Sequence, residues 1–381
     1  MVKRYVLLVL YPNHLSGYGV GHAALSIVDG MNGSGFKCVL TVPSANSSIN
    51  PKSIRKIFSG ITLKFIYKLF SQQLVQTLTE LLFFYQIKPN DIVYLWPDAS
   101  IKLMRKIKAK GNLIVIENIN CHQKLSKAIL DDEAARLKLE HAHQVSQANI
   151  DFETEKLRLC DFVFSPSPMV TDSLQKADVP KEKILESNYG LNKQQQVDKL
   201  LPTKFKKNTI EVIFVGRVCM RKGIHLILEY WQAANINGRL KIIGNIEANI
   251  RDLISGYYAD VSIEFVDFVA DIEQVFKTAD VFVLPSLEEG SPLVTYLALG
   301  AGLPCVVSPM GGQGVVTDGH DGFILDPHDK SAWVDALQNL ASSPTLREEL
   351  SYAARSSSDR FLWETVGQQR AGLLLEKLQG K

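Results

Sequence analysis

The chain has 381 residues, which is long for one domain and sufficient for two domains that each bury a core. Apolar residues make up 46% and charged residues 22% of the sequence, and the net charge of +2 gives no global field that would attract nucleic acid. The five cysteines are odd in number and no two have metal-ligand spacing, so neither a disulfide framework nor a zinc site is expected, and a reducing cytoplasm fits.

Short apolar runs alternate with segments of helical periodicity along the chain. The first run lies in MVKRYVLLVLYPNH, which resembles a signal peptide but lacks a small-residue cleavage site, so a buried first strand is expected. No stretch has the length needed to cross a bilayer. Continuous apolar strands between helices predict parallel sheets with helices on both faces. The expected strands are 5–11, 37–43, 91–97, 112–118, 161–167, 184–190, 211–217, 239–245, 262–268, 280–286, 304–309 and 322–325.

A polar, basic stretch divides these elements into two sets. It is KQQQVDKLLPTKFKKN, residues 193–208, and it has the composition of a linker. We therefore predict two doubly wound, Rossmann-like α/β domains, at 1–195 and 205–358, that face a cleft. Ligands of such sheets bind beyond the carboxyl ends of the strands, so the functional residues should follow strands and face that cleft.

The loop after the first expected strand, SGYGVGHAAL at residues 16–25, is rich in glycine. Gly17, Gly19 and Gly21 would let the backbone approach a ligand in front of a helix N-terminus, as at a phosphate group. The loop resembles the dinucleotide-binding fingerprint but lacks its last glycine. An ordinary tight turn between strand and helix is therefore an equal alternative.

Two loops of the expected second domain carry charged residues. FVGRVCMRKG, residues 214–223, places Arg217 beyond a strand and Lys222 at the start of the next helix. A guanidinium and an ammonium at this spacing suit a diphosphate, or are solvated surface groups. In EEGSP, the carboxylates of Glu288 and Glu289 either accept hydrogen bonds from sugar hydroxyls or complement the dipole of the helix that follows.

Two further features have a functional and a structural interpretation. Asp131, Asp132 and Glu133 would suit a metal ion, but they lie inside a run of helical periodicity, so a solvated helix face is expected. Residues 51–70 mix apolar and basic side chains at helical spacing, and 101–111 is a second basic stretch. The first segment is either a helix on an anionic membrane surface or an amphipathic helix packed on the sheet.

Six segments together resemble the retaining glycosyltransferases of family 4. That family has the GT-B fold, in which two Rossmann-like domains face each other. The last segment is similar to the family's closing helix, which implies that 359–381 crosses back to the first domain. In chain order the segments are NYGLN (188–192), FVGRVCMRKG (214–223), ADVFVLPS with the EG that follows it (279–290), GLPCVVSPMGG (302–312), DGFILDPHD (321–329) and DRFLWETVGQQRAGLLLEKL (359–378).

The resemblance implies a donor site in the cleft. Arg217 and Lys222 would hold the diphosphate of the donor, where they would stabilise the negative charge that develops as the diphosphate leaves. Glu289 and His122 would contact the transferred sugar, and these four residues form the implied catalytic set. The other implied donor-binding residues are Gly17, Gly19, Gly21, Gly216, Phe268, Val269, Gly290, Ser291, Pro292 and Leu293.

Three positions depart from the family pattern. Leu297 stands where the family has the second glutamate of its signature, which accepts hydrogen bonds from the nucleotide ribose. Gln313 and Gly314 follow the Gly-Gly pair where the family has a glutamate, and Asp267 stands where a glycine is usual. These changes imply that the donor binds more weakly, that it binds differently, or that the site has lost its activity.

The resemblance implies a metal-independent, retaining transferase of the hexosyltransferase type that has no cofactor. Its donor would be a nucleotide diphosphate sugar and its acceptor a glycan or a lipid-linked glycan, in bacterial surface polysaccharide assembly. The enzyme would be cytoplasmic, at the inner face of the cell membrane if residues 51–70 bind lipid, with no nucleic-acid partner. Two alternatives stay open: a catalytically impaired member that acts as a partner or scaffold for an active transferase, and an epimerase of the same fold.

Overall fold

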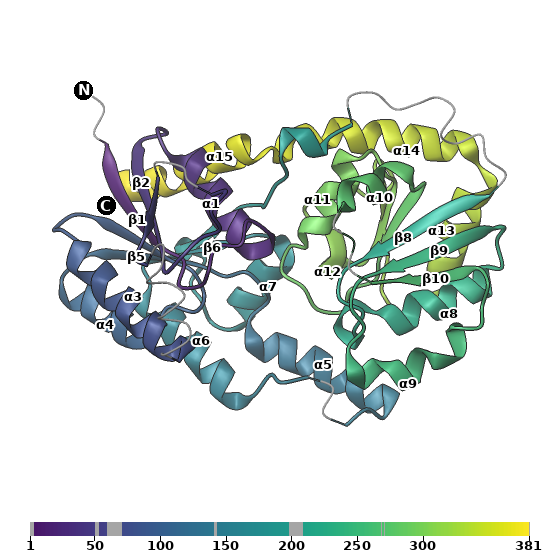
Figure 1. Cartoon of the computed structure of the whole chain (residues 1–381), viewed down its shortest axis with the longest axis horizontal. Coiled ribbons are helices and arrows are strands. Elements are labelled where there is room, and N and C mark those ends of the chain that lie inside the picture. The colour runs from purple at the N-terminus through teal and green to yellow at the C-terminus, as the bar shows by residue number, and fades with distance from the viewer. Residues whose placement is uncertain are drawn as a thin grey trace.

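The computed structural model describes residues 4–49, 53–58, 71–140, 143–197, 209–267, 269 and 271–380. These residues form two parallel sheets, one in each domain, with helices on both faces of each sheet (Figure 1). The predicted fold class, two doubly wound α/β domains, is confirmed. Within the described ranges, no helix is both long enough and apolar enough to span a bilayer.

The first sheet has seven strands in the order β3-β2-β1-β4-β5-β6-β7, and all of its pairings are parallel. The direction of winding changes between β1 and β4, so a crevice lies beyond the carboxyl ends of these strands. The strands are β1 (Tyr5–Leu10), β2 (Phe36–Val42), β3 (Ile54–Lys56), β4 (Ile92–Leu95), β5 (Leu113–Glu117), β6 (Phe162–Ser165) and β7 (Ile184–Glu186).

The helices of the first domain connect these strands. Serine precedes four of them, and its hydroxyl accepts a hydrogen bond from a backbone N–H of the first turn, which satisfies a donor that lacks an intrahelical partner. The helices are α1 (Gly19–Met31), α3 (Gln72–Gln86), α4 (Ile101–Ala109), α5 (Gln123–Leu137), α6 (Gln147–Leu159) and α7 (Pro168–Lys176).

The second sheet has six parallel strands in the order β10-β9-β8-β11-β12-β13. Its winding changes direction between β8 and β11, so a second crevice lies beyond the carboxyl ends of these strands. This crevice faces that of the first sheet. The strands are β8 (Ile210–Val215), β9 (Gly238–Ile243), β10 (Ile263–Val266), β11 (Val281–Leu284), β12 (Cys305–Val307) and β13 (Gly322–Ile324). The helices are α8 (Ile224–Ala234), α9 (Arg251–Ile254), α10 (Ile272–Thr278), α11 (Leu293–Gly300), α12 (Pro309–Gly312), α13 (Lys330–Ser342) and α14 (Pro344–Ser357).

The last helix, α15 (Trp363–Gln379), returns from the second domain and packs against α1 of the first (Figure 1). Gly30 and Gly367 allow the two helices to touch, since a Cβ on Gly30 would lie only 3.0 Å from the Cα of Gly367. Arg370 of α15 is fully buried and its guanidinium is 2.9 Å from the carboxylate of Glu117 at the end of β5. The closing helix is therefore anchored in the core of the first domain.

The twelve predicted strands are all present, and β3 is an additional one. The prediction of a helix across 51–70 is wrong for Ile54–Lys56, which pair with β2 as an edge strand. Residues 50–52 and 59–70 lie outside the described residues, as do 198–208 of the predicted linker.

Candidate functional site

A cavity of about 770 Å³ lies between the two domains and contains residues from both. We call it the interdomain cavity. The loop after β1 contributes Gly17 and Gly19, the loop after β8 contributes Gly216 and Arg217, and the first turns of α11 contribute Leu293. The predicted glycine loop and the predicted basic loop thus lie on one cavity, although they are about half the chain apart.

The glycines of this cavity have backbone conformations that favour glycine. Gly17, Gly19 and Gly216 have φ values of 85°, 56° and 145°. Apart from its neighbours along the chain, no heavy atom of the described residues lies within 4 Å of the position of a Cβ on Gly19, so the backbone in front of α1 is open to a ligand. Gly21 is different: it is buried within α1, and its Cβ position is 3.1 Å from the side chain of Leu15.

Arg217 lies at the edge of the interdomain cavity. Its side chain is 68% exposed and pairs with Glu247 at 3.2 Å. Arg217 also lines a second cavity, of about 600 Å³, which we call the bridging cavity because it lies between the domains and adjoins the first. An exposed arginine that pairs with one carboxylate keeps other donors for an anionic ligand.

Lys222 belongs to a buried cluster of charged residues next to Gly216. Its ammonium is 2.5 Å from the carboxylate of Glu289. The guanidinium of Arg221 lies 3.0 Å from the same carboxylate. Arg221 also donates to the carbonyl of Glu288 at 2.9 Å and lies 3.4 Å from the carboxylate of that residue. A Cβ on Gly216 would be 3.3 Å from the Cε of Lys222, so the lysine lies directly behind the wall of the interdomain cavity.

The pKa values of the two glutamates of this cluster shift in opposite directions. Burial would raise the pKa of Glu289, but Lys222 and Arg221 outweigh this effect and hold the pKa below its ordinary value. Burial raises the pKa of Glu288, and Arg221 opposes that effect only in part. Glu289 is therefore the more readily ionised carboxylate of the pair. Arg221 was missed in the sequence, although it adjoins Lys222 in CMRKG.

The loop of Glu288, Glu289 and Gly290 contacts the first domain. A Cβ on Gly290 would lie 1.7 Å from the carbonyl oxygen of Ile119, so only glycine fits there. The hydroxyl of Ser167 donates to the Gly290 carbonyl at 2.6 Å. The two domains thus touch at the loop that carries the predicted sugar-binding glutamate.

Residues of α11 form one wall of the interdomain cavity, whereas Gly290, Ser291 and Pro292 are not among its lining residues in the described part of the chain. The hydroxyl of Ser291 is buried and lies 2.7 Å from that of Tyr296. Pro292 precedes α11, which has no side-chain cap, and Leu293 and Leu297 line the cavity. The backbone N–H groups at the start of α11 are therefore close to the cavity.

His122 lies apart from these residues. It is 2% exposed and precedes α5, where its Nδ1 accepts a hydrogen bond from the Lys124 N–H at 3.2 Å. Its Nε2 is 3.7 Å from Glu153 and has no hydrogen-bond partner in the described part of the chain. Burial lowers the pKa of His122. Within the described residues, it does not line the interdomain cavity.

Two further predicted donor-binding residues follow β10. Val269 lines the interdomain cavity. Phe268 lies outside the described residues. Their neighbours on α10, Asp271 and Glu273, also line the cavity, and sequence reasoning did not select them. Asp271 caps α10 by accepting a hydrogen bond from the Gln274 N–H at 3.1 Å, whereas the Glu273 side chain makes no ion pair or hydrogen bond among the described residues.

Two departures from the family pattern have structural consequences. Leu297 places an apolar side chain on the cavity wall. Gly314 has a φ of 86°, and its Cβ position is 2.7 Å from the ring of Pro168 in the first domain. A glutamate at 314 would clash with Pro168, so the glycine permits the contact between the domains.

The expectation of a solvated face for Asp131, Asp132 and Glu133 is wrong for Glu133. Its side chain is 4% exposed, and its carboxylate is 2.6 Å from the Nε2 of His225 on α8. This face of α5 meets the second domain, which the sequence alone does not reveal. Asp131 is 49% exposed and pairs with Lys127 at 2.5 Å. In the described ranges, no cluster of acids, histidines and cysteines could hold a metal ion.

The geometry favours a phosphorylated ligand between the domains. Two glycine turns and a helix start leave backbone N–H groups close to the cavity, and Arg217 and Lys222 add positive charge at its edge and behind its wall. The apolar side chains of Ile243, Val269 and Leu293 offer a surface for a flat or apolar group.

Comparison with known proteins gives similar sequences and similar folds. The family model described as Glycosyl transferases group 1 matches residues 209–343. A D-inositol 3-phosphate glycosyltransferase of Paenarthrobacter aurescens is 28% identical over 183 residues, which are 45% of this chain and 44% of the relative. A UDP-Gal:alpha-D-GlcNAc-diphosphoundecaprenol alpha-1,3-galactosyltransferase of Escherichia coli is 30% identical over 167 residues, 41% of this chain and 42% of the relative. The chain thus spans less than half the length of these two relatives.

A solved structure matches over the whole chain. The crystal structure of Anabaena Alr3699/HepE in complex with UDP and glucose has a TM-score of 0.68 at 15% identity, and the match covers 99% of this chain and 100% of that one. At this level of identity the likeness is one of fold, with two sheets that face each other.

Proposed function

Since this chain belongs to the group 1 glycosyltransferases of family 4, which have the GT-B fold, we propose that it transfers a sugar from a nucleotide diphosphate sugar to an acceptor hydroxyl, with retention of configuration. The observation that carries the proposal is the interdomain cavity, where the glycine turns of both domains, Arg217 and the start of α11 meet. The donor would lie there with its diphosphate towards Arg217 and Gly216.

The charges of the site suit the departure of a diphosphate. As the bond to the sugar breaks, negative charge develops on the diphosphate, and Arg217 and Lys222 would stabilise it where it develops. Lys222 is held by Glu289 at 2.5 Å, so it is pre-positioned rather than free to move in solvent. The ionised carboxylate of Glu289 would accept hydrogen bonds from sugar hydroxyls.

The retaining mechanism of the family requires no carboxylate pair across the sugar. The acceptor hydroxyl would attack from the face of the leaving group, and a leaving phosphate oxygen would take its proton. Contact between the domains would exclude water and so favour transfer over hydrolysis. For the acceptor we propose a glycan or lipid-linked glycan, because one relative is a transferase to a diphosphoundecaprenol-linked sugar. Such a reaction would place the protein at the cytoplasmic face of a membrane.

The test is a screen of nucleotide diphosphate sugars for slow hydrolysis, without acceptor. Arg217→Ala should reduce hydrolysis of the best donor about 10- to 100-fold, and Lys222→Ala about 100-fold or more, as for the loss of a group that stabilises developing charge. Arg239→Ala is the matched control, since Arg239 is an exposed arginine that pairs with Glu264 at 3.3 Å near the amino end of β9. Unchanged hydrolysis in both site variants would show that the phosphate site is wrong.

The alternative is a family member that acts as a partner or scaffold for an active transferase. Leu297 and Gly314, which lack the carboxylates of the family, favour it. Calorimetry with UDP, GDP, ADP, CDP and TDP separates the two functions. Binding of one nucleotide that weakens in Arg217→Ala supports the transferase, and binding of none supports the scaffold.

A further inference from the structure

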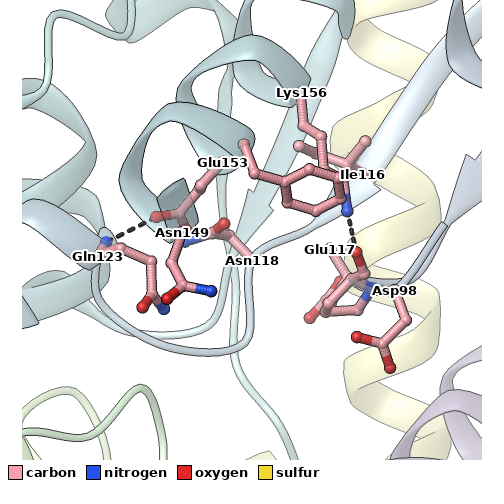
Figure 2. A pocket seen from close by; sticks show the side chains of 10 residues that line it. Asp98, Ile116, Glu117, Asn118, Gln123, Asn149, Glu153 and Lys156 are labelled. Atoms are coloured by element: carbon pink, nitrogen blue, oxygen red, sulfur yellow. Dashed lines mark hydrogen bonds between the residues drawn. The ribbon is translucent and has the colours of Figure 1, made fainter. Parts of the chain in front are cut away.

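A third cavity, of about 230 Å³, lies within the first domain (Figure 2). We call it the polar cavity. It lies beyond the carboxyl ends of β4 and β5, beneath α6, and shares no residue with the interdomain cavity. Its lining residues are Pro97, Asp98, Ile116, Glu117, Asn118, Gln123, Asn149, Phe152, Glu153 and Lys156.

The polar cavity connects with the proposed donor site through shared residues. Gln123 lines both the polar cavity and the bridging cavity, and Arg217 lines both the bridging cavity and the interdomain cavity. The polar cavity is therefore a neighbour of the bridging cavity, which is in turn a neighbour of the interdomain cavity.

Lys156 is an unusual lysine at the centre of this lining. It is 6% exposed, and no carboxylate in the described part of the chain lies within ion-pair distance of it. One of its three N–H donors binds the carbonyl of Pro97. The ammonium also lies 5.3 Å from the centre of the Phe152 ring, a cation–π contact that supplies no hydrogen-bond acceptor. A buried ammonium with one hydrogen bond is costly unless a ligand supplies further acceptors. Burial accordingly lowers the pKa of Lys156 to about 8.

Glu153 lies on the same helix and faces the same cavity (Figure 2). Its carboxylate accepts a hydrogen bond from the Gln123 N–H at 2.6 Å and lies 3.7 Å from the unpartnered Nε2 of His122. Burial raises the pKa of Glu153 to about 7, so near neutral pH it can both donate and accept hydrogen bonds. Asp98 adds a second carboxylate, which accepts a hydrogen bond from the Asn13 amide at 2.5 Å.

We propose that the polar cavity binds one neutral monosaccharide unit of the acceptor, and the inference rests on the proposed transferase function. The carboxylates accept hydrogen bonds from sugar hydroxyls, and Lys156 and the amides of Asn118 and Asn149 donate to them. Phe152, which is 42% exposed, offers an apolar face to the ring.

The size and charge of the cavity define this class of ligand. Its 230 Å³ is below the roughly 300–1,000 Å³ of pockets for drug-sized ligands, so one sugar ring is the natural occupant. Glu117 is already neutralised by Arg370, which leaves Asp98 and Glu153 against the single cation of Lys156. This balance disfavours an acidic sugar or a phosphate.

The test uses methyl glycosides as probes of the polar cavity. Saturation-transfer NMR would measure binding of methyl α- and β-pyranosides of glucose, galactose, mannose and N-acetylglucosamine, with methyl glucuronide as the acidic comparator. We expect at least one neutral glycoside to bind the wild type. Its affinity should fall at least about 10-fold in Lys156→Met, which removes the ammonium but keeps the length of the side chain.

Two further variants keep the test decisive if Lys156→Met fails to fold. Phe152→Ala alters a half-exposed side chain and should also weaken binding of the same glycoside. Lys176→Met, a 66% exposed lysine that pairs with Asp172 at 2.7 Å, is the matched control and should bind as the wild type does. An octyl glycoside of the same sugar distinguishes the two sources of the bound unit. It should bind more tightly than the methyl glycoside if the acceptor is lipid-linked, and no more tightly if the acceptor is a free glycan.

The inference is overturned if no neutral glycoside binds the wild type, or if binding is unaffected in both Lys156→Met and Phe152→Ala. Tighter binding of methyl glucuronide than of the neutral glycosides would also overturn it, because the site would then prefer an anionic ligand. Failure of the proposed function looks different, since the wild type would then neither bind a nucleotide diphosphate nor hydrolyse any donor.

Discussion

At the scale of single residues, the acids of the interdomain cavity decide how a nucleotide can be held. Leu297 lines the cavity, but its apolar side chain cannot accept a hydrogen bond. The half-buried carboxylate of Glu273, on the neighbouring helix α10, lines the same cavity and makes no ion pair within the described residues. Hydroxyl groups of a nucleoside need acceptors when they leave water. We therefore expect Glu273 to accept a hydrogen bond from the bound nucleotide.

The Glu273→Gln variant tests this expectation. It should raise the KM for the nucleotide sugar by about 10-fold, because a hydrogen bond to a charged group contributes about 1.5–3 kcal/mol. The kcat should change little, since the same contact exists before and during the reaction. Steady-state kinetics of donor hydrolysis measures both. Glu229→Gln is the control, a half-exposed carboxylate that pairs with Lys330 at 2.8 Å, and an unchanged KM in Glu273→Gln would place the nucleotide away from α10.

At the scale of elements, the closing helix α15 is held by a buried ion pair. Arg370 and Glu117 are both fully buried, and Arg370 also donates to the Asn188 carbonyl at 3.1 Å. Arg370→Leu should destabilise the protein by about 3–5 kcal/mol, since it leaves the Glu117 carboxylate uncompensated in the core. For a domain of this size, this loss of stability lowers the melting temperature by about 10 °C. Calorimetry measures the shift.

A second variant distinguishes the lost charge from lost packing. In Arg370→Leu with Glu117→Leu, no charge is left uncompensated, but the buried hydroxyls of Tyr94 and Tyr189 lose the carboxylate that accepts their hydrogen bonds. The melting temperature should therefore recover part of the loss. If the double variant were less stable than Arg370→Leu, packing rather than charge would hold α15 in place.

The same elements show how far the sequence alone predicts this molecule. The strands were predictable because each is a continuous apolar run, and the cavity-lining glycines because each follows such a run. The edge strand β3 was not, since its three residues lie in a basic segment and depend on pairing with β2. Arg221 and Glu133 were missed for one reason: each meets its charged partner only through contact between segments more than 60 residues apart. The position of His122 in the chain was evident, but its burial depends on α6 and α7.

At the scale of the whole molecule, several contacts hold the two domains together. The Gly290 loop contacts Ile119, and Gly314 contacts Pro168. In addition, α5 contacts α8, where the buried carboxylate of Glu133 faces three cationic or titratable groups. Those groups are Arg136, His225 and His328. Burial alone would raise the pKa of Glu133, but hydrogen bonds from His225 and Arg136 lower it to about 2.

This arrangement predicts a pH dependence with a definite sign. The folded pKa of Glu133 is about 2 and its ordinary value is 4.5, so its contribution to stability is complete above about pH 5 and disappears as pH falls towards 2. The unfolding free energy of Glu133→Gln should therefore be lower than that of the wild type at pH 7, and the difference should shrink steadily below pH 5. Urea denaturation at each pH measures it. The control is Asp131→Asn, an exposed carboxylate two residues away on α5, which should differ little from the wild type at pH 7. A difference for Glu133→Gln that stays constant down to pH 3 would show that the contact between α5 and α8 does not depend on the charge of Glu133.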